Sequence, residues 1–183
     1  MPPSPLDAVL EAAAHGDAAS LRALYDELAP AVVGYLRARG AREPEDLCSE
    51  VFLSVFTRLS TISGGAAGLR TLLFSVAHAR LVDELRRRSR RGESTSLDEL
   101  ADPRTAPSAE DEALAAHGGD AVRDVLAQLP PDQRDVLLLR LVGDLTVDQV
   151  AETMGKSAGA VKQLQRRGLS TLRARFARSG VPL

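Results

Sequence analysis

Residues 92–119 divide the sequence into two stretches, and this division constrains the fold more than any other feature. The segment is rich in Ser, Pro, Gly and acidic residues, and its few apolar residues show no regular spacing. We therefore predict a flexible acidic linker there, between one domain at residues 1–91 and a second at residues 120–183. A chain of 183 residues is long enough to form two small cores.

Both flanking stretches favour helices. Only 3% of residues are aromatic and none is Trp, so the composition favours helix formers over strand formers. Apolar residues recur every three or four positions over residues 18–39, 43–59 and 69–85, with Asp17 and Pro44 placed to start the first two helices. Four further helices are predicted at 121–129, 130–143, 146–155 and 157–178. The predicted fold class is all-α, with two small helical domains.

A helix-turn-helix is predicted within the second domain. Thr146 and Gln149 have the spacing of a capping box that opens a short helix, and Gly155 ends that helix. Ser157 can then cap the next helix. Val161 of that second helix is placed to pack against the first helix as its apolar anchor. Together these spacings are more specific than any one of them alone.

The second helix of this motif carries polar groups that suit DNA. Gln and Arg can form paired hydrogen bonds with base edges, and further Lys and Arg can neutralise phosphates. DNA recognition is therefore one hypothesis, and a basic helix that is merely solvated is the alternative. Outside its apolar stripe the helix carries Ala158, Lys162, Gln163, Gln165, Arg166 and Arg167.

The charge is unevenly distributed. The net charge of −2 argues against a protein that binds nucleic acid over its whole surface. Five arginines nevertheless fall within residues 86–91, and residues 153–183 contain basic residues and no acid. Acidic residues predominate between these two basic segments. The net charge therefore conceals a basic segment, an acidic segment and a second basic segment in succession.

Several classes of function are disfavoured. Cys48 is the single cysteine, and the three histidines lack the spacing of metal ligands, so neither a metal site nor a cofactor is expected. No nucleophile with a base, paired carboxylates or phosphate-binding glycine loop supports an enzyme. No apolar run approaches the length of a membrane span, so we expect a cytoplasmic protein without membrane insertion. Cys48, Phe52 and Phe56 are interpreted as packing residues.

Three segments resemble bacterial RNA polymerase sigma factors. Residues 129–173 resemble sigma region 4, which recognises the minus-thirty-five promoter element. The segment EPEDLCSEVFLSVF resembles the part of region 2 that binds the polymerase, and GLRTLLFSVAHARLVDELRRRSRR resembles the following segment for minus-ten recognition and melting. The absence of a region 3 domain between them is typical of the small extracytoplasmic-function (ECF) group. The resemblance implies core RNA polymerase, promoter DNA and an anti-sigma factor as partners.

The resemblance also implies roles for individual residues in the two domains, 1–91 for polymerase binding and the minus-ten element and 120–183 for the minus-thirty-five element. The expected polymerase-binding residues are Asp46, Ser49, Glu50 and Leu53. The residues expected to contact the minus-ten element and the separated strand are Ser63, Gly64, Arg70, His78, Arg80, Arg86, Arg87 and Arg88. The residues expected to contact the minus-thirty-five element are Ser157, Ala158, Ala160, Lys162, Gln163, Gln165, Arg166 and Arg167.

Some positions depart from the family pattern. Leu72 stands where the family often has Trp, and His78 and Ala79 stand where it often has Arg and Asn. Gly168 lies inside the second helix of the motif, at a cost of about 1 kcal/mol relative to Ala.

The competing function is a stand-alone helix-turn-helix regulator, which would bind its operator without the polymerase.

Overall fold

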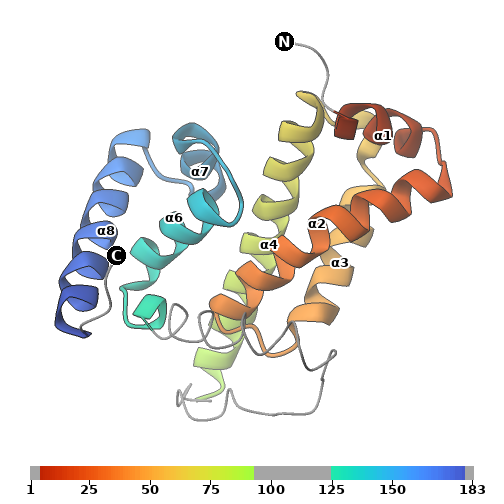
Figure 1. Ribbon diagram of the computed structural model, residues 1–183. Coiled ribbons are helices and arrows are strands. Elements are labelled where there is room, and N and C mark those ends of the chain that lie inside the picture. Colours follow the sequence, from red (N-terminus) through yellow and green to blue (C-terminus); the bar gives the residue numbers. More distant parts are fainter. Residues whose placement is uncertain (1–4, 93–124, 180–183) are drawn as a thin grey trace.

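The computed structural model describes residues 5–92 and 125–179, and these form two helical units (Figure 1). We call residues 5–92 the N-terminal unit and residues 125–179 the C-terminal unit. Within these ranges the chain forms helices and no strand, which confirms the predicted all-α class. The predicted linker, apart from Gly92, lies outside the described residues.

The N-terminal unit is a bundle of four α-helices with one short 3₁₀ helix. Its elements are α1 (Pro5–Ala14), α2 (Ala18–Ala38), α3 (Pro44–Phe56), η1 (Leu59–Thr61) and α4 (Gly65–Arg90). Asp17 caps α2 as predicted, because its Oδ2 accepts the Ser20 N–H at 2.7 Å. Pro44 occupies the first turn of α3, also as predicted.

Apolar faces of all four helices meet in the core of this bundle. Leu24 and Val32 of α2 and Leu69 of α4 are fully buried. Phe52 packs edge-to-face against Tyr25 and Phe56, with ring centroids 4.8 and 5.4 Å apart. The three- and four-residue spacing of the sequence therefore corresponds to the buried faces of α2, α3 and α4.

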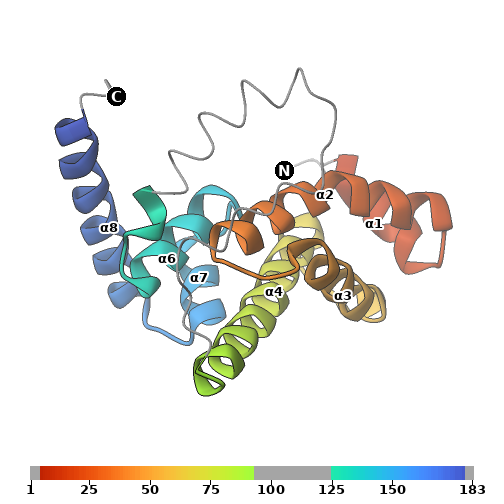
Figure 2. The same ribbon diagram turned by 90° about the horizontal axis from the view of Figure 1, so that it is seen from below.

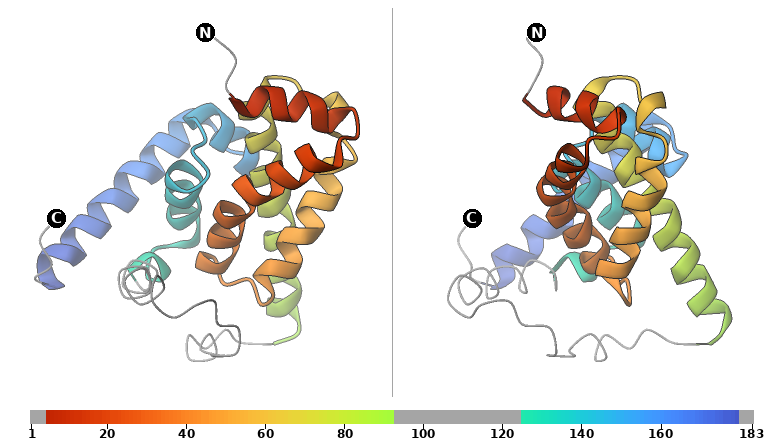
Figure 3. Two further views of the ribbon diagram at one scale, coloured as in Figure 1. Left: turned by 45° about the vertical axis from the view of Figure 1, so that its right-hand side comes forward. Right: turned by 90° about the vertical axis from the view of Figure 1, so that its right-hand side faces the viewer.

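Helix α1 was not predicted from the sequence. It starts at Pro5, a favourable residue for the first turn, and buries Leu10 and Ala13. Figure 3 shows α1 lying across the end of the bundle at which α4 begins. It contacts α2, η1 and α4, so it belongs to the bundle.

The C-terminal unit contains the predicted helix-turn-helix. Its helices are α6 (Pro131–Leu141), α7 (Val147–Met154) and α8 (Ala158–Ser179), and residues 125–127 are also helical. Thr146 and Gln149 form the capping box, with hydrogen bonds of 3.3 and 2.7 Å in its two directions. Gly155 ends α7 in the left-handed conformation, with φ of +62°.

Gly168 allows α6 and α8 to approach closely. A Cβ atom at this position would lie 2.9 Å from Cδ1 of Leu137, whose side chain is buried in α6. The intrinsic helix cost of glycine is therefore offset by a helix contact that a larger residue would obstruct.

The two units pack against each other, a contact that the sequence did not predict. Helices α4 and α7 are in contact (Figures 1 and 2). Arg39 of α2's C-terminus and Asp135 of α6 form a buried ion pair, with Nη2 to Oδ2 at 3.1 Å and Nε bonded to Oδ1. The hydroxyl groups of Ser75 and Thr153 lie 2.8 Å apart. A buried ion pair and a half-buried pair of hydroxyl groups thus join two units that are far apart in the sequence.

Candidate nucleic-acid interface

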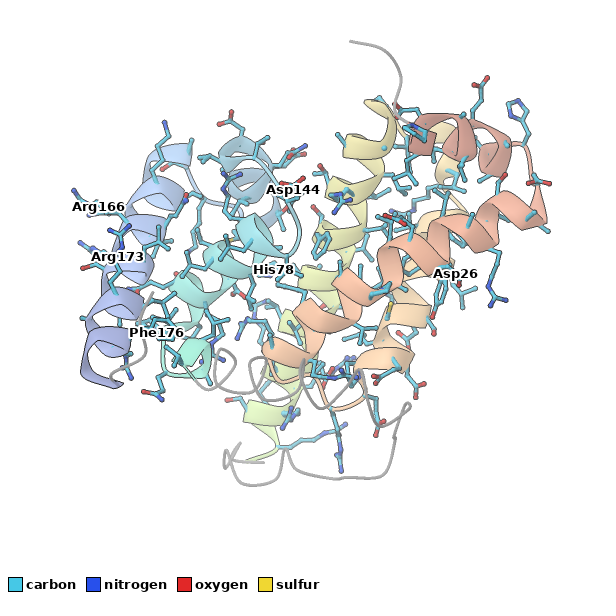
Figure 4. All side chains as sticks on the ribbon, viewed as in Figure 1. Asp26, His78, Asp144, Arg166, Arg173 and Phe176 are labelled. Atoms are coloured by element: carbon cyan, nitrogen blue, oxygen red, sulfur yellow. The ribbon has the colours of Figure 1, made fainter. Side chains whose placement is uncertain are left out.

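The exposed side of α8 carries most of the side chains predicted to contact the minus-thirty-five element. Ser157 caps this helix, because its Oγ accepts the Ala160 N–H at 3.2 Å. Val161 is fully buried and fixes the rotation of the helix on the unit. Figure 4 shows Arg166 and Arg173 pointing away from the rest of the described molecule. Of the predicted residues, Ser157, Lys162, Gln163, Arg166 and Arg167 are exposed, and Ala158, Ala160 and Gln165 are half-buried.

This arrangement can recognise DNA in two ways. A helix with a buried anchor and an opposite polar side can enter a major groove with that side facing the bases. Gln163 offers an amide and Arg166 a guanidinium, both of which can make paired hydrogen bonds with base edges. Lys162 and Arg167 add positive charge for phosphates.

The four predicted polymerase-binding residues lie on one face of α3. Asp46, Ser49, Glu50 and Leu53 are all exposed, at the three- and four-residue spacing of a helix face. Leu53 is 69% exposed and Leu141 of α6 is 70% exposed, and these two are the exposed large apolar residues of the described part of the chain. One Glu50 carboxylate oxygen lies 2.7 Å from Nη1 of Arg80 on α4. The α3 face therefore combines an apolar group with a charged border.

The turn between η1 and α4 contains the residues predicted to capture a minus-ten base. Ser63 and Gly64 are exposed, and Gly64 has a φ of +84° that favours glycine. Arg70 lies one and a half turns into α4 and is half-buried. Ser63 and Gly64 are therefore accessible to a ligand, while the Gly64 carbonyl accepts the Gly68 N–H at 3.1 Å.

The arginines near the end of α4 differ in their surroundings. Arg86 and Arg87 are exposed. Arg88 is half-buried, with Nη1 donating to the Gly40 carbonyl at 3.0 Å and lying 3.8 Å from Glu84. Arg86 and Arg87 are therefore better placed than Arg88 to contact a strand in this arrangement.

His78 faces the C-terminal unit, so the packed arrangement leaves it little access to a DNA strand. Its Nδ1 lies 2.8 Å from the Tyr35 hydroxyl, and Figure 4 shows it on the side of α4 that faces the C-terminal unit. Burial lowers the pKa of His78, with smaller effects of Asp135 and Arg39 in opposite directions.

The depressed pKa of His78 predicts a loss of stability in acid. Since the unfolded histidine titrates near 6.5, the unfolded state binds more protons than the folded state as the pH falls below that value. The contribution of neutral His78 to the free energy of unfolding is therefore present above pH 6.5 and is lost as the pH falls below it. We expect His78→Gln to flatten the dependence of the urea midpoint on pH between 7.5 and 5. A slope equal to that of the unchanged protein would contradict this.

Cys48, Phe52 and Phe56 belong to the packing of the first bundle. Cys48 is completely buried, and burial raises the pKa of its thiol to about 11. Its Sγ lies 4.0 Å from the Ala29 carbonyl oxygen.

No helix among the described residues is long and apolar enough to cross a membrane. In residues 5–92 and 125–179, no three His, Cys, Asp or Glu side chains are grouped so that they could hold a metal ion.

Three residues of structural consequence were missed by sequence reasoning. Asp7 accepts a hydrogen bond from the first turn of α4, and Arg39 and Asp135 pair between the units. The spacing of Leu6, Leu10 and neighbouring apolar residues after Pro5 could have revealed α1. No local pattern indicates a pair separated by 96 positions in the sequence.

Comparison with family models identifies both units. The sigma-70 region 2 model matches residues 24–91, and the sigma-70 region 4 model matches residues 125–174. A solved structure of CnrH in complex with the cytosolic domain of CnrY shares the fold, with a TM-score of 0.66, 18% identity, and coverage of 96% of this chain and 99% of that chain.

Comparison with curated proteins gives relatives of one kind. The ECF RNA polymerase sigma factor ShbA of Streptomyces griseus is 31% identical over 179 residues, which cover 92% of this chain and 94% of ShbA. SigD of Mycobacterium tuberculosis, another ECF sigma factor, is 30% identical, with coverage of 96% and 85%. BldN of Streptomyces coelicolor is 31% identical over 90% of this chain, which spans only 63% of BldN. The chain therefore belongs to the ECF sigma factors of the sigma-70 family, which are transcription initiation factors.

Proposed function

We propose that this sigma factor docks on core RNA polymerase through the exposed face of α3 and directs initiation at promoters that its two units recognise separately. The observation that carries the proposal is the α3 face, on which 69%-exposed Leu53 is aligned with Asp46, Ser49 and Glu50. One exposed leucine alone is common on protein surfaces, and the support comes from its alignment with three polar side chains on the helix that the family uses for the polymerase.

We assign recognition of the minus-thirty-five element to α8. The support is the capped helix-turn-helix, with its buried Val161 and its exposed Gln163, Arg166 and Arg167. Base-edge contacts would specify the sequence, and Lys162 would add a phosphate contact. The C-terminal domain for this task spans residues 120–183.

We assign the minus-ten element to the N-terminal domain, residues 1–91. Ser63 and Gly64 form an exposed turn next to the start of α4, where an extruded base can be bound by backbone and hydroxyl groups. The exposed Arg86 and Arg87 can then hold the separated strand by its phosphates. Residues 92–119 would tether the two domains and allow them to reach separate elements.

The same proposal covers partners and chemistry. We place the protein in the cytoplasm, where sigma factors act with the polymerase, and assign it no catalytic residue, because phosphodiester synthesis belongs to the polymerase. An anti-sigma factor that covers these surfaces would keep it inactive. The solved structure of CnrH with the cytosolic domain of CnrY supports a protein partner for this fold.

Run-off transcription tests the proposed function. Core polymerase should start at new, discrete positions on a genomic fragment library when the protein is added, while the protein alone should bind the same fragments weakly. A Leu53→Asp variant should lose both polymerase binding and initiation but keep its helical circular-dichroism signal, because Leu53 is outside the core. Strong, specific binding to an operator without polymerase, together with unchanged start sites, would favour the stand-alone regulator.

A further inference from the structure

The turn that precedes α4 has no cap of its own. Gly64 occupies the N-cap position in the left-handed conformation and provides no side-chain hydrogen bond to the helix. The first amides of any helix lack partners within it, and the N-terminus carries partial positive charge. A long helix such as α4 therefore requires an acceptor from elsewhere, or from water, at the point where it meets Ser63 and Gly64.

Asp7 of α1 supplies that acceptor. Its Oδ1 accepts the Ala66 N–H at 2.7 Å in a partly buried position, across 59 residues of sequence. The bond joins a negative carboxylate to the positive end of the helix, which strengthens it relative to a neutral pair. Helix α1, which carries Asp7, also contacts both η1 and α4.

Two glycines at the start of α4 lie in close contact with their surroundings: Gly65 with the Asp7 carboxylate and Gly68 with the backbone of Ser63. A Cβ at Gly65 would lie 2.4 Å from Oδ1 of Asp7, and a Cβ at Gly68 would lie 1.9 Å from the carbonyl oxygen of Ser63. At Gly68 the obstacle is backbone, which cannot move aside, and at Gly65 the positive φ of +60° itself favours glycine. The segment SGGAAG is therefore built around a defined contact and is more than a flexible spacer.

We infer that Asp7 is a positioning residue for minus-ten recognition: its carboxylate holds the Ser63–Gly64 turn in the shape that accepts the extruded base. Asp7 would touch no DNA and would act through the Ala66 amide and the turn. This inference rests on the proposed function, in which that turn binds the base.

The alternative is that Asp7 only attaches α1 to the bundle. Such a role would change the amount of folded protein and would lower initiation equally at all promoters. A positioning role would instead change the ratio between promoters that differ at a single minus-ten base. The ratio is therefore the informative measurement.

The experiment uses full-length protein with core polymerase on promoters recovered by run-off transcription, each also prepared with single substitutions in the minus-ten element. For Asp7→Ala we expect discrimination between the best and worst minus-ten base to fall about tenfold, with affinity for core polymerase unchanged. Asp7→Asn keeps an acceptor oxygen and should restore most of the discrimination. Glu11→Ala, on the exposed side of the same helix, is the matched control and should behave as the unchanged protein.

The outcomes separate this inference from the proposed function. If discrimination by Asp7→Ala equals that of the Glu11→Ala control while initiation falls uniformly, Asp7 is only structural and the inference is overturned. If Asp7→Ala does not fold, Asp7→Glu, which keeps the charge but displaces the acceptor by one methylene, must reduce the discrimination, and an unchanged ratio there overturns the inference. If the unchanged protein directs no initiation at all, the proposed function fails instead.

Discussion

Replacing Asp135 with Ala is expected to shift the balance between packed and separated units by about 3–5 kcal/mol toward separation, a factor of roughly a hundred to several thousand. The side chains of Arg39 and Asp135 are 7% and 5% exposed, so removal of the carboxylate leaves a buried guanidinium without a counter-ion. Separation of the two units would expose that charge to water. The radius of gyration from small-angle X-ray scattering should therefore increase.

Asp132→Ala provides the control for this prediction. Asp132 lies on the same helix and pairs with Lys156 at 2.9 Å, but its side chain is 54% exposed. Exposed pairs contribute at most about 1 kcal/mol, so this variant should scatter as the unchanged protein does. Replacing both Arg39 and Asp135 with Leu removes the unpaired charge and should restore the smaller radius. Identical radii for Asp135→Ala and Asp132→Ala would show that the ion pair does not hold the units together.

Joint replacement of Arg166 and Arg167 with Ala is expected to lower initiation at least tenfold at promoters with a minus-thirty-five element. A good base-edge contact contributes about 1–3 kcal/mol, and loss of a phosphate contact weakens binding further. Both side chains are exposed, so the fold should be unaffected. Run-off transcription and melting temperature measure the two effects separately.

Arg22→Ala is the matched control for the arginine pair. Arg22 is also exposed, but it lies on α2 with Nε 2.9 Å from Asp26, which Figure 4 shows on the side of the molecule opposite α8. Its loss removes one exposed arginine, against two in the tested variant, without touching the proposed recognition helix. Unchanged initiation by the Arg166 and Arg167 variant, or an equal loss with Arg22→Ala, would remove the assignment of α8.

Local chemistry explains why most of the fold could be predicted. The apolar spacing of α2, α3 and α4 is set by burial of one face, and that spacing is visible in the sequence. The helix-turn-helix was equally visible, because capping boxes and left-handed glycines satisfy local requirements of the backbone. Asp17, Thr146 and Gly155 each cap a helix through residues only a few positions away in the sequence.

Interactions between distant residues explain the rest. Asp7 looks like an ordinary acid in a first turn, and its acceptor role appears only when α1 crosses the start of α4. Gly168 looks like a defect until Leu137 is seen beside it. The neighbours of His78 could not be predicted in the same way, because they include Tyr35 of another helix and charges of the other unit.

The contact between α4 and α7 sets a geometric requirement on promoter binding. Helix α8 packs on α7, and α7 on α4, so only one helix, about 10 Å wide, separates the two proposed DNA-reading helices. Elements centred at minus ten and minus thirty-five lie roughly 25 base pairs apart, or about 85 Å along the duplex. For α8 and the N-terminal unit to bind the two elements at the same time, as proposed, we expect the contact between α4 and α7 to open.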